Sequence, residues 1–500
     1  MQAGWLFSSL NLLSLTLSAI LFRMLYNHFA RPLYKYPGPF IASCTRFWLV
    51  YIAWTGHVEQ YYLEVHRKYG PVVRIGPNEL SFASPDAGLD IFRPGRGFNK
   101  TDFYPVFLPD GIKDIFTEIR EKVHAKKKRH ASPPYSLASV KLQTKQIERL
   151  MLDLISIMDS VATKSQTETF DLGSWLHFMA FDVLAQFAFD RPFGFLKQGK
   201  DIDNFILSIS QSTYESSYLA QIPTLERLTR SNPIWKYVPF LPKNKLRMMP
   251  ETAEIVLKEF LDPENEKSKT AVCLLKSLLD AHFNNPGTFG MEDVMAISMG
   301  AIAAGSDTTA STMHSFCWHI LANPQIHRKL VAELLDAPLS TVIQYEEAIV
   351  LPYFQACLQE TMRLQPALSH NMPRVVPDGG ATVNGTFLSG GTRVAVSAWV
   401  MHRDKTVFGS DSNSFNPERW LDADVDRVKR MERCMFQFGG GSHICIGRYL
   451  ALFELNKALP QMFRRYEMKL VNPEKPLECF TGMFYQQKGL HVTMKLRETQ

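Results

Sequence analysis

The stretch FGGGSHICIG, Phe438 to Gly447, is the most informative part of this chain. Gly439, Gly440 and Gly441 remove side chains just before Cys445, so the backbone can lie against a flat and bulky group. The apolar pattern RYLALFELNKAL follows directly and predicts a helix. A thiolate just before a helix is stabilised by the N–H groups at the helix N-terminus. The stretch therefore predicts a cysteine whose sulfur binds a large planar cofactor.

Taken alone, this stretch has other interpretations. A phosphate-binding loop would place Lys-Ser or Lys-Thr after the glycines, and neither follows them here. Zinc binding through His443 and Cys445 would require further ligands, and the chain has no CxxC pair. An ordinary loop with a buried thiol stays open at this point.

A second motif, AGSDTT at residues 304–309, lies inside a long apolar segment that predicts a helix. Asp307 next to Thr308 is costly in such a helix unless the carboxylate has a partner or a function. A helix kink formed by Gly305, Ser306 and the threonines is the structural alternative.

Two further patterns place charged residues on helix faces. Glu360 and Arg363, in QETMRLQP, lie one turn apart, a spacing that is common in surface ion pairs and uninformative by itself. In EKVHAKKKRH, residues 121–130, His124 and Lys128 share a helix face, for which a solvated basic surface is the alternative.

In their order along the chain, these motifs resemble those of the cytochrome P-450 superfamily. Phe438, Gly441, Cys445 and Gly447 match its pattern F-x-x-G-x-R-x-C-x-G, with His443 at the usual arginine position. The resemblance implies that Cys445 is the axial thiolate ligand of a haem b iron and that Phe438 shields the metal–sulfur bond from water.

The resemblance also assigns roles to residues outside the cysteine loop. Asp307 and Thr308 would deliver protons during oxygen activation. The expected haem-contacting basic residues are His443, His124, Lys128 and Arg374. The expected buried ion network consists of Glu360, Arg363 and Arg419, the last from FNPERW. The expected substrate contacts are the loop 103–119 together with Ala301, Gly305, Ser369, Met372, Met483 and Phe484.

These roles imply a haem-thiolate monooxygenase that inserts one oxygen atom from O2 into a lipophilic small molecule, such as a terpenoid or polyketide intermediate of fungal secondary metabolism. The chain is most similar to fungal pisatin demethylase-like members. No GxGxxG follows a predicted strand, so electrons would come from a separate NADPH–cytochrome P450 reductase, with cytochrome b5 as a second possible donor. A haem-thiolate isomerase or dehydratase and a non-catalytic haem protein for electron transfer or sensing are the alternatives.

The N-terminus predicts a membrane anchor. Residues 3–22 contain no charged side chain and have roughly the twenty residues that a membrane-spanning helix needs. Arg23, Arg31 and Lys35 follow, which predicts a single-pass protein of the endoplasmic reticulum membrane with its bulk on the cytoplasmic side. A cleaved signal peptide is the competing interpretation. We therefore expect an anchor at residues 1–30 and a catalytic domain at 31–500.

Composition limits the remaining possibilities. With 46% apolar residues the chain can bury a large core, and a net charge of +6 over 500 residues does not indicate nucleic-acid binding. The seven cysteines lack framework spacing, as expected in a reducing compartment.

Helical periodicity dominates residues 140–365, while short strands are predicted at 71–84, 374–400 and 489–496. The segment 232–245 mixes aromatic residues with lysines, which fits core packing or contact with the membrane interface. The expected fold is mainly α with a small β part, preceded by one transmembrane helix.

Overall fold

A computed structural model describes residues 2–29, 32–108, 112–164, 167–229, 248–262, 270–421 and 424–498. The aromatic and basic segment 232–245 and part of the loop 103–119 lie outside these ranges.

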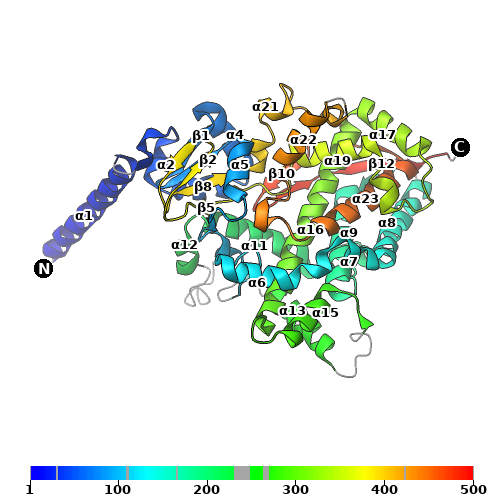
Figure 1. The fold of residues 1–500 in the computed structure, drawn as a ribbon, viewed down its shortest axis with the longest axis horizontal. Coiled ribbons are helices and arrows are strands. Elements are labelled where there is room, and N and C mark those ends of the chain that lie inside the picture. The colour runs from blue at the N-terminus through cyan, green and yellow to red at the C-terminus, as the bar shows by residue number, and fades with distance from the viewer. Residues whose placement is uncertain are drawn as a thin grey trace.

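The fold is mainly helical with a small β part, as predicted (Figure 1). The long helices beyond the N-terminal one are α8 (Thr144–Lys164), α9 (Leu172–Phe189), α11 (Phe205–Leu219), α13 (Met248–Leu261), α15 (Leu274–Asn284), α16 (Met291–Ala322), α17 (Pro324–Asp336), α19 (Pro352–Leu364) and α23 (Arg448–Arg465). α16 crosses the middle of the helical region and packs against α9, α19 and α23.

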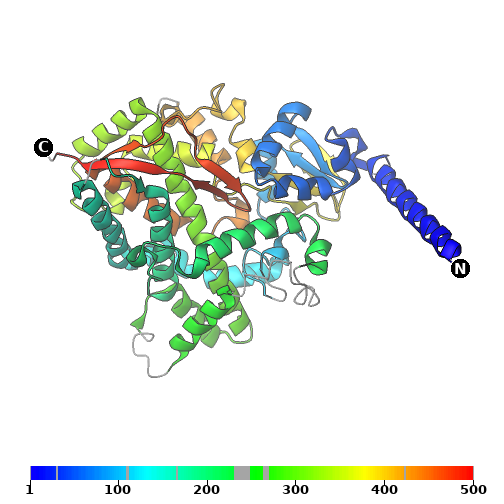
Figure 2. The same cartoon turned by 180° about the vertical axis from the view of Figure 1, so that it is seen from behind.

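The strands form small sheets. The largest sheet has the order β1-β2-β8-β5-β3, with strands β1 (Val72–Gly76), β2 (Glu79–Phe82), β3 (Asn99–Lys100), β5 (Arg374–Val375) and β8 (Arg393–Val396). β1 and β2 form the predicted antiparallel hairpin, and β2 pairs in parallel with β8. The smaller sheets are β4-β12-β9 (Phe170–Asp171, His491–Leu496, Tyr466–Leu470), β10-β11 (Glu478–Thr481, Tyr485–Lys488) and β6-β7 (Ala381–Val383, Thr386–Leu388). Strands lie in all three predicted segments, whereas β3, β4, β9, β10 and β11 lie outside them. Seen from behind, β12 runs along the helical region on the side opposite the N-terminus (Figure 2).

α9 is buried because it is apolar on all sides. Within the described part of the chain it is the one helix of 18 residues or more that also meets an apolar composition typical of membrane spans. However, 83% of it is covered by other parts of the protein, so α9 is a core helix.

The N-terminal helix α1 (Gln2–Phe29) projects away from the rest of the molecule (Figures 1 and 2). Its C-terminal end is held by hydrogen bonds. The Asn27 side chain donates to Cys44 O at 2.8 Å, and the buried Arg74 guanidinium donates to Asn27 O at 2.6 Å and to His28 O at 3.1 Å. The helix is therefore joined to the domain at a defined angle.

Candidate functional site

The cysteine loop lies between α22 (Val425–Cys434) and α23. Cys445 N–H donates to Phe438 O at 2.8 Å, which closes the loop, and α23 begins at Arg448 as the sequence predicts. The Lys128 ammonium, from α6 (Glu121–Ala131), donates to the carbonyls of Ser442 at 2.6 Å and Ile444 at 3.1 Å. Lys128 thus fastens the loop, a role that the sequence did not indicate.

Packing within the protein explains two of the loop glycines. Gly441 has φ +59°, and a Cβ on it would lie 1.7 Å from Phe92 O, so no other residue fits there. A Cβ on Gly440 would lie 2.6 Å from the Phe436 ring. These contacts with Phe92 and Phe436 shape the loop whether or not a planar group lies against it.

Two properties of the Cys445 thiol suit a side chain that lines an enclosed space inside the protein. Its side chain is exposed, yet surrounding protein raises the pKa of the thiol by desolvation. The backbone N–H groups of Gly447 and Arg448, at the start of α23, act in the opposite direction and favour the thiolate, as does the nearby Lys128 charge. All seven cysteines are free.

The predicted basic residues gather beside this loop. The rings of His124 and His443 lie 4.3 Å apart, and His443 Nε2 donates to Glu121 Oε2 at 2.9 Å. Arg374 donates through Nη1 to Tyr104 Oη and to Pro373 O at 3.0 Å. Three buried nitrogens have no hydrogen-bond partner among the described residues: Nδ1 of His124, Nδ1 of His443 and Nη2 of Arg374.

Lys100 belongs to the same basic group, although its position in the sequence gave no sign of this. Its ammonium donates to the carbonyls of Ile115 and Phe116, both at 2.8 Å. Burial and the neighbouring Arg374 charge lower the Lys100 pKa to about 7. The pKa of His124 is lowered to about 3 by burial and, next, by the Lys100 charge. Burial and then mutual repulsion thus lower the pKa values within the cluster, and an anionic group bound there would relieve the repulsion.

A strip along α16 is open in the middle of an otherwise buried helix. Ala304 is exposed, and Gly300, Ala301 and Thr308 are half-buried, whereas Asp307 and its neighbours on other faces are buried. The residues 300, 304 and 308 are spaced by four and share one face. The Thr308 hydroxyl lies in this strip and donates to Ala304 O at 3.0 Å. The helix is continuous from Met291 to Ala322.

Asp307 is turned away from the strip. Its fully buried carboxylate accepts from His177 Nε2 at 2.8 Å and from Gln486 Nε2 at 2.9 Å. The Gln486 amide also contacts Ser210 Oγ at 2.9 Å. His177 comes from α9 and Gln486 from β11, and no local pattern in the sequence indicated either one. Asp307 thus has the partner that a carboxylate in an apolar helix needs.

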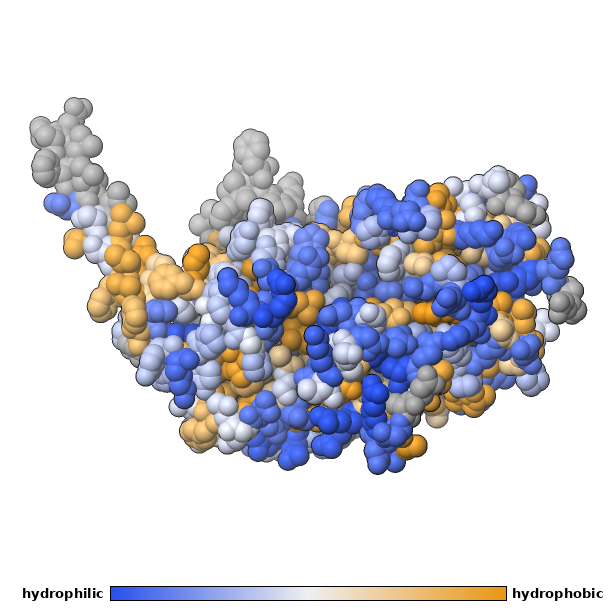
Figure 3. All heavy atoms as spheres, turned by 90° about the horizontal axis from the view of Figure 1, so that it is seen from above, coloured by the Kyte–Doolittle hydropathy of each residue, from blue (hydrophilic) through white to orange (hydrophobic). Residues whose placement is uncertain are grey.

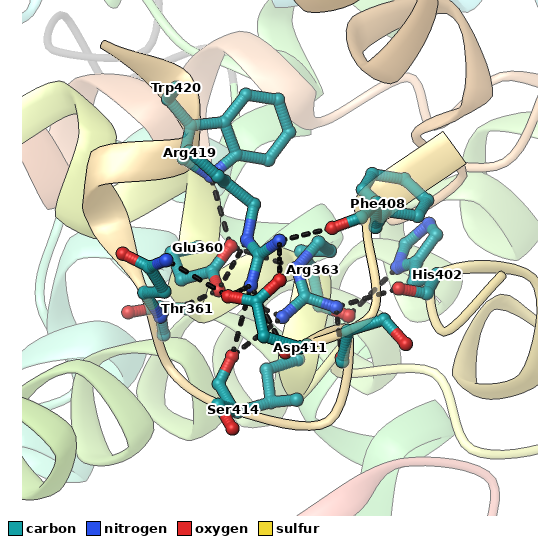
Figure 4. Close-up of polar contacts among 12 residues, drawn as sticks. Glu360, Thr361, Arg363, His402, Phe408, Asp411, Ser414, Arg419 and Trp420 are labelled. Carbon is teal, nitrogen blue, oxygen red and sulfur yellow. Dashed lines mark hydrogen bonds and ion pairs between the residues drawn. The ribbon is translucent and has the colours of Figure 1, made fainter. Parts of the chain in front are cut away.

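The predicted ion network is present and fully buried (Figure 4). Arg363 donates to both oxygens of Glu360 at 2.8 Å, and Arg419 Nε donates to Glu360 Oε1 at 3.0 Å. The Arg419 guanidinium also pairs with Asp411 at 2.9 Å. Glu360 and Arg363 have side chains that are 0% exposed, which excludes the alternative of a surface pair.

His402 connects this network to the cysteine loop. Its Nδ1–H donates to Arg363 O at 3.0 Å, while its Nε2 accepts from Phe436 N at 2.7 Å. The contact with Phe436 requires the neutral ring, because a protonated Nε2 could not accept, and burial lowers the His402 pKa to about 3.

Most of the predicted substrate contacts converge on one apolar cluster. Phe103, Tyr104, Val106, Ala220 and Met483 are buried together, and Phe116, Ile119, Met372 and Phe484 pack against them. Ser369 is held against the turn between β10 and β11, because its hydroxyl donates to Gly482 O at 2.9 Å. Ala301 and Gly305 belong instead to the large core around α16, and a Cβ on Gly305 would lie 2.6 Å from Leu184 of α9. Packing against α9 therefore explains Gly305 better than free space does.

Comparison with known proteins agrees with these motifs. The family model "Cytochrome P450" matches residues 37–494. Cytochrome P450 monooxygenase cicH of Emericella nidulans is 30% identical over 473 residues, which cover 92% of this chain and 93% of the relative. Cytochrome P450 monooxygenase pkfB, also of Emericella nidulans, is 31% identical, with 92% and 91% covered. Cytochrome P450 monooxygenase mpaDE of Penicillium roqueforti is 30% identical, and the chain spans only 55% of its length.

The chain belongs to the cytochrome P450 family, whose members are haem-thiolate monooxygenases with an axial cysteine thiolate. The residues present fit this cofactor. Cys445 has an exposed thiol at the start of a helix, and the partnerless nitrogens of His124 and Arg374 can donate to the carboxylates of a haem, whereas Nδ1 of His443 could do so only in the protonated ring, because its Nε2 already donates to Glu121.

Proposed function

We propose that this chain is a haem-thiolate monooxygenase acting on a lipophilic small molecule. The observation that carries the proposal is the Cys445 thiol, held at the N-terminus of α23 in a loop that Lys128 fastens. A bound haem would supply an iron that activates O2 with two electrons. The protein would contribute the thiolate, and the Gly447 and Arg448 N–H groups would keep it ionised.

The basic cluster would orient the cofactor. His124 and Arg374 each present a buried nitrogen without a hydrogen-bond partner, which a carboxylate would satisfy, while His443 lies beside His124 and donates to Glu121. Lys128 and Lys100 already donate to backbone carbonyls, so their part would be to hold the loops that surround the cofactor and to add positive charge.

Proton supply would involve Thr308 and Asp307 in different ways. The Thr308 hydroxyl lies in the open strip, where it can turn from Ala304 O toward a bound oxygen species or a water. Asp307 would act as a relay behind the strip, and His177 would connect it to solvent, since the His177 side chain is 21% exposed and donates directly to Asp307.

The substrate would be apolar over most of its surface, because Phe103, Phe107, Phe116, Met483 and Phe484 form the cluster where the predicted contacts meet. The named relatives are fungal monooxygenases, and a role in secondary metabolism follows by analogy. Electrons would come from an NADPH–cytochrome P450 reductase, with cytochrome b5 as a second donor.

Residues 1–30 would anchor the protein in the endoplasmic reticulum membrane, with the catalytic domain, 31–500, on the cytoplasmic side. The exposed part of α1 is apolar, and apolar residues continue onto the adjacent corner of the domain (Figure 3). The side chains that form this corner are between 52% and 60% exposed: Phe40, Ile41, Phe47, Tyr51 and Trp54. Such a surface suits contact with lipid.

Isotope incorporation tests this function. Metabolite extract from a strain lacking the gene would be incubated with the purified protein, the reductase, NADPH and 18O2. We expect a product with one 18O atom and matching NADPH consumption. A product that forms without 18O and without NADPH consumption would support the isomerase or dehydratase alternative and contradict the proposal.

A further inference from the structure

The loop before α6 holds a buried carboxylate, Asp114, whose two oxygens differ. Thr117 donates to Oδ1 twice, through its N–H at 2.7 Å and its hydroxyl at 2.6 Å. The Phe116 N–H also lies close enough to lower the pKa of the carboxyl. No other side chain of the described residues donates a hydrogen bond to Asp114, and both Thr117 bonds go to Oδ1.

The second oxygen of Asp114, Oδ2, lies against α16 at Gly300. A Cβ on Gly300 would lie 2.1 Å from Asp114 Oδ2, so only glycine leaves room for the carboxyl. Gly300 begins the open strip, one helical turn before the exposed Ala304 and two turns before Thr308. Asp114 Oδ2 is therefore placed at one end of the strip where the proposed oxygen chemistry takes place.

This placement is costly without a ligand. Asp114 is 8% exposed, and an uncompensated buried carboxylate destabilises a fold. The Lys100 charge favours the Asp114 carboxylate, but its ammonium donates to the carbonyls of Ile115, Phe116 and Glu118. No described cation lies within ion-pair distance of Asp114. Burial accordingly raises the Asp114 pKa.

The surroundings offer an approach for a ligand. A surface cavity of about 530 Å³ is lined by Lys113 and Met299, the immediate chain neighbours of Asp114 and Gly300. On another side, Phe116 leads into the apolar cluster of the predicted substrate contacts. An amphipathic molecule could therefore place a polar group at Asp114 and its apolar body along the cluster and the strip.

We propose that Asp114 Oδ2 binds a hydrogen-bond-donating group of the substrate, either a hydroxyl or a protonated amine, and thereby fixes the orientation of an otherwise apolar molecule along α16. This inference rests on the proposed monooxygenase function and narrows its substrate class. Thr117 holds the carboxyl in place, and Gly300 gives it room.

Three probes of equal chain length test this inference in the full-length ferric haem protein: dodecyl methyl ether, 1-dodecanol and N,N-dimethyldodecylamine. Binding is followed by the shift of the haem absorption. We expect the alcohol or the amine to bind about tenfold more tightly than the ether. Preference for both points to any donor, whereas preference for the amine alone points to an ammonium group.

Two variants separate this role from a structural one. In Asp114→Asn the side-chain oxygen can still accept from Thr117, so the loop keeps its turn while the carboxylate is lost. In Gly300→Ala the carboxyl stays but is displaced. Both variants should lose the donor preference while binding of the ether changes less than twofold.

The inference is overturned if neither donor probe binds more tightly than the ether in the wild type, or if the preference survives in both variants. A protein that lacks a thiolate-haem spectrum would instead refute the proposed function, and this inference with it. The two failures are therefore distinguishable.

Discussion

Replacing Glu360 by Gln should destabilise the fold by about 3–5 kcal/mol. Glu360 Oε1 accepts from Arg363 Nη2, Arg419 Nε and Asn416 N, and Oε2 accepts from Arg363 Nε and Trp420 Nε1. A glutamine has one acceptor oxygen. In its better orientation it keeps the three bonds at the Oε1 position and places an NH2 group against the other two donors.

Each lost bond to a charged group is worth about 1.5–3 kcal/mol, and two arginines also lose a buried counter-charge. Glu418→Gln is the matched control, because Glu418 lies nearby and pairs with Lys329 at the surface. Its loss should cost about 1 kcal/mol or less. Urea unfolding of the detergent-solubilised protein, followed by tryptophan fluorescence, compares the two variants with the wild type. Equal stability of the two variants, or a loss below 1 kcal/mol for Glu360→Gln, would refute the reasoning.

Three further outcomes are expected. Thr308→Ala should keep NADPH consumption but release hydrogen peroxide in place of product. Thr309→Ala, which loses the same kind of hydroxyl–carbonyl bond on a buried face, should still convert NADPH consumption into product. An equal ratio of product to NADPH in the two variants would contradict the proposed role of the Thr308 hydroxyl. Since the folded state lowers the His402 pKa to about 3, the neutral ring stabilises the fold above pH 6.5, and this contribution falls by about 2 kcal/mol between pH 6.5 and 5. In urea unfolding, the free energy of unfolding of His402→Gln should therefore fall by about 2 kcal/mol less than that of the wild type between pH 6.5 and 5. The same pH dependence in both proteins would exclude this contribution of His402. Deleting residues 2–22, which leaves the docked end of α1 intact, should release much of the protein from membranes in a sedimentation assay. In the full-length protein, the exposed glycosylation sequon at Asn384 should stay unmodified. An endoglycosidase-sensitive mass shift would contradict the cytoplasmic orientation.

Local patterns were sufficient for the elements that carry the site. The helix after Cys445, the long helix around Asp307 and the hairpin at residues 72–82 each follow from periodicity and turn residues within one segment. The pairing of Glu360 with Arg363 also follows from spacing along a single helix. That this pair is buried could be inferred only from the resemblance.

Contacts between distant segments could not be predicted in this way. His177 reaches Asp307 across 130 residues, and Lys128 reaches the cysteine loop across more than 300. Neither has a local pattern that distinguishes it from its neighbours. The glycines illustrate the same limit, since the sequence assigns Gly441 to a planar cofactor and Gly305 to a substrate contact, whereas Phe92 and Leu184 occupy the space beside them.

The axial thiolate is the central claim, and the spectrum of the reduced protein with carbon monoxide tests it most directly. The wild type should show the strongly red-shifted Soret band of thiolate-bound haem. Cys445→Ser should lack this band, while Cys434→Ser, which changes a buried cysteine just before the same loop, should keep it. Retention of the band in Cys445→Ser would show that another cysteine binds the iron and would contradict the account.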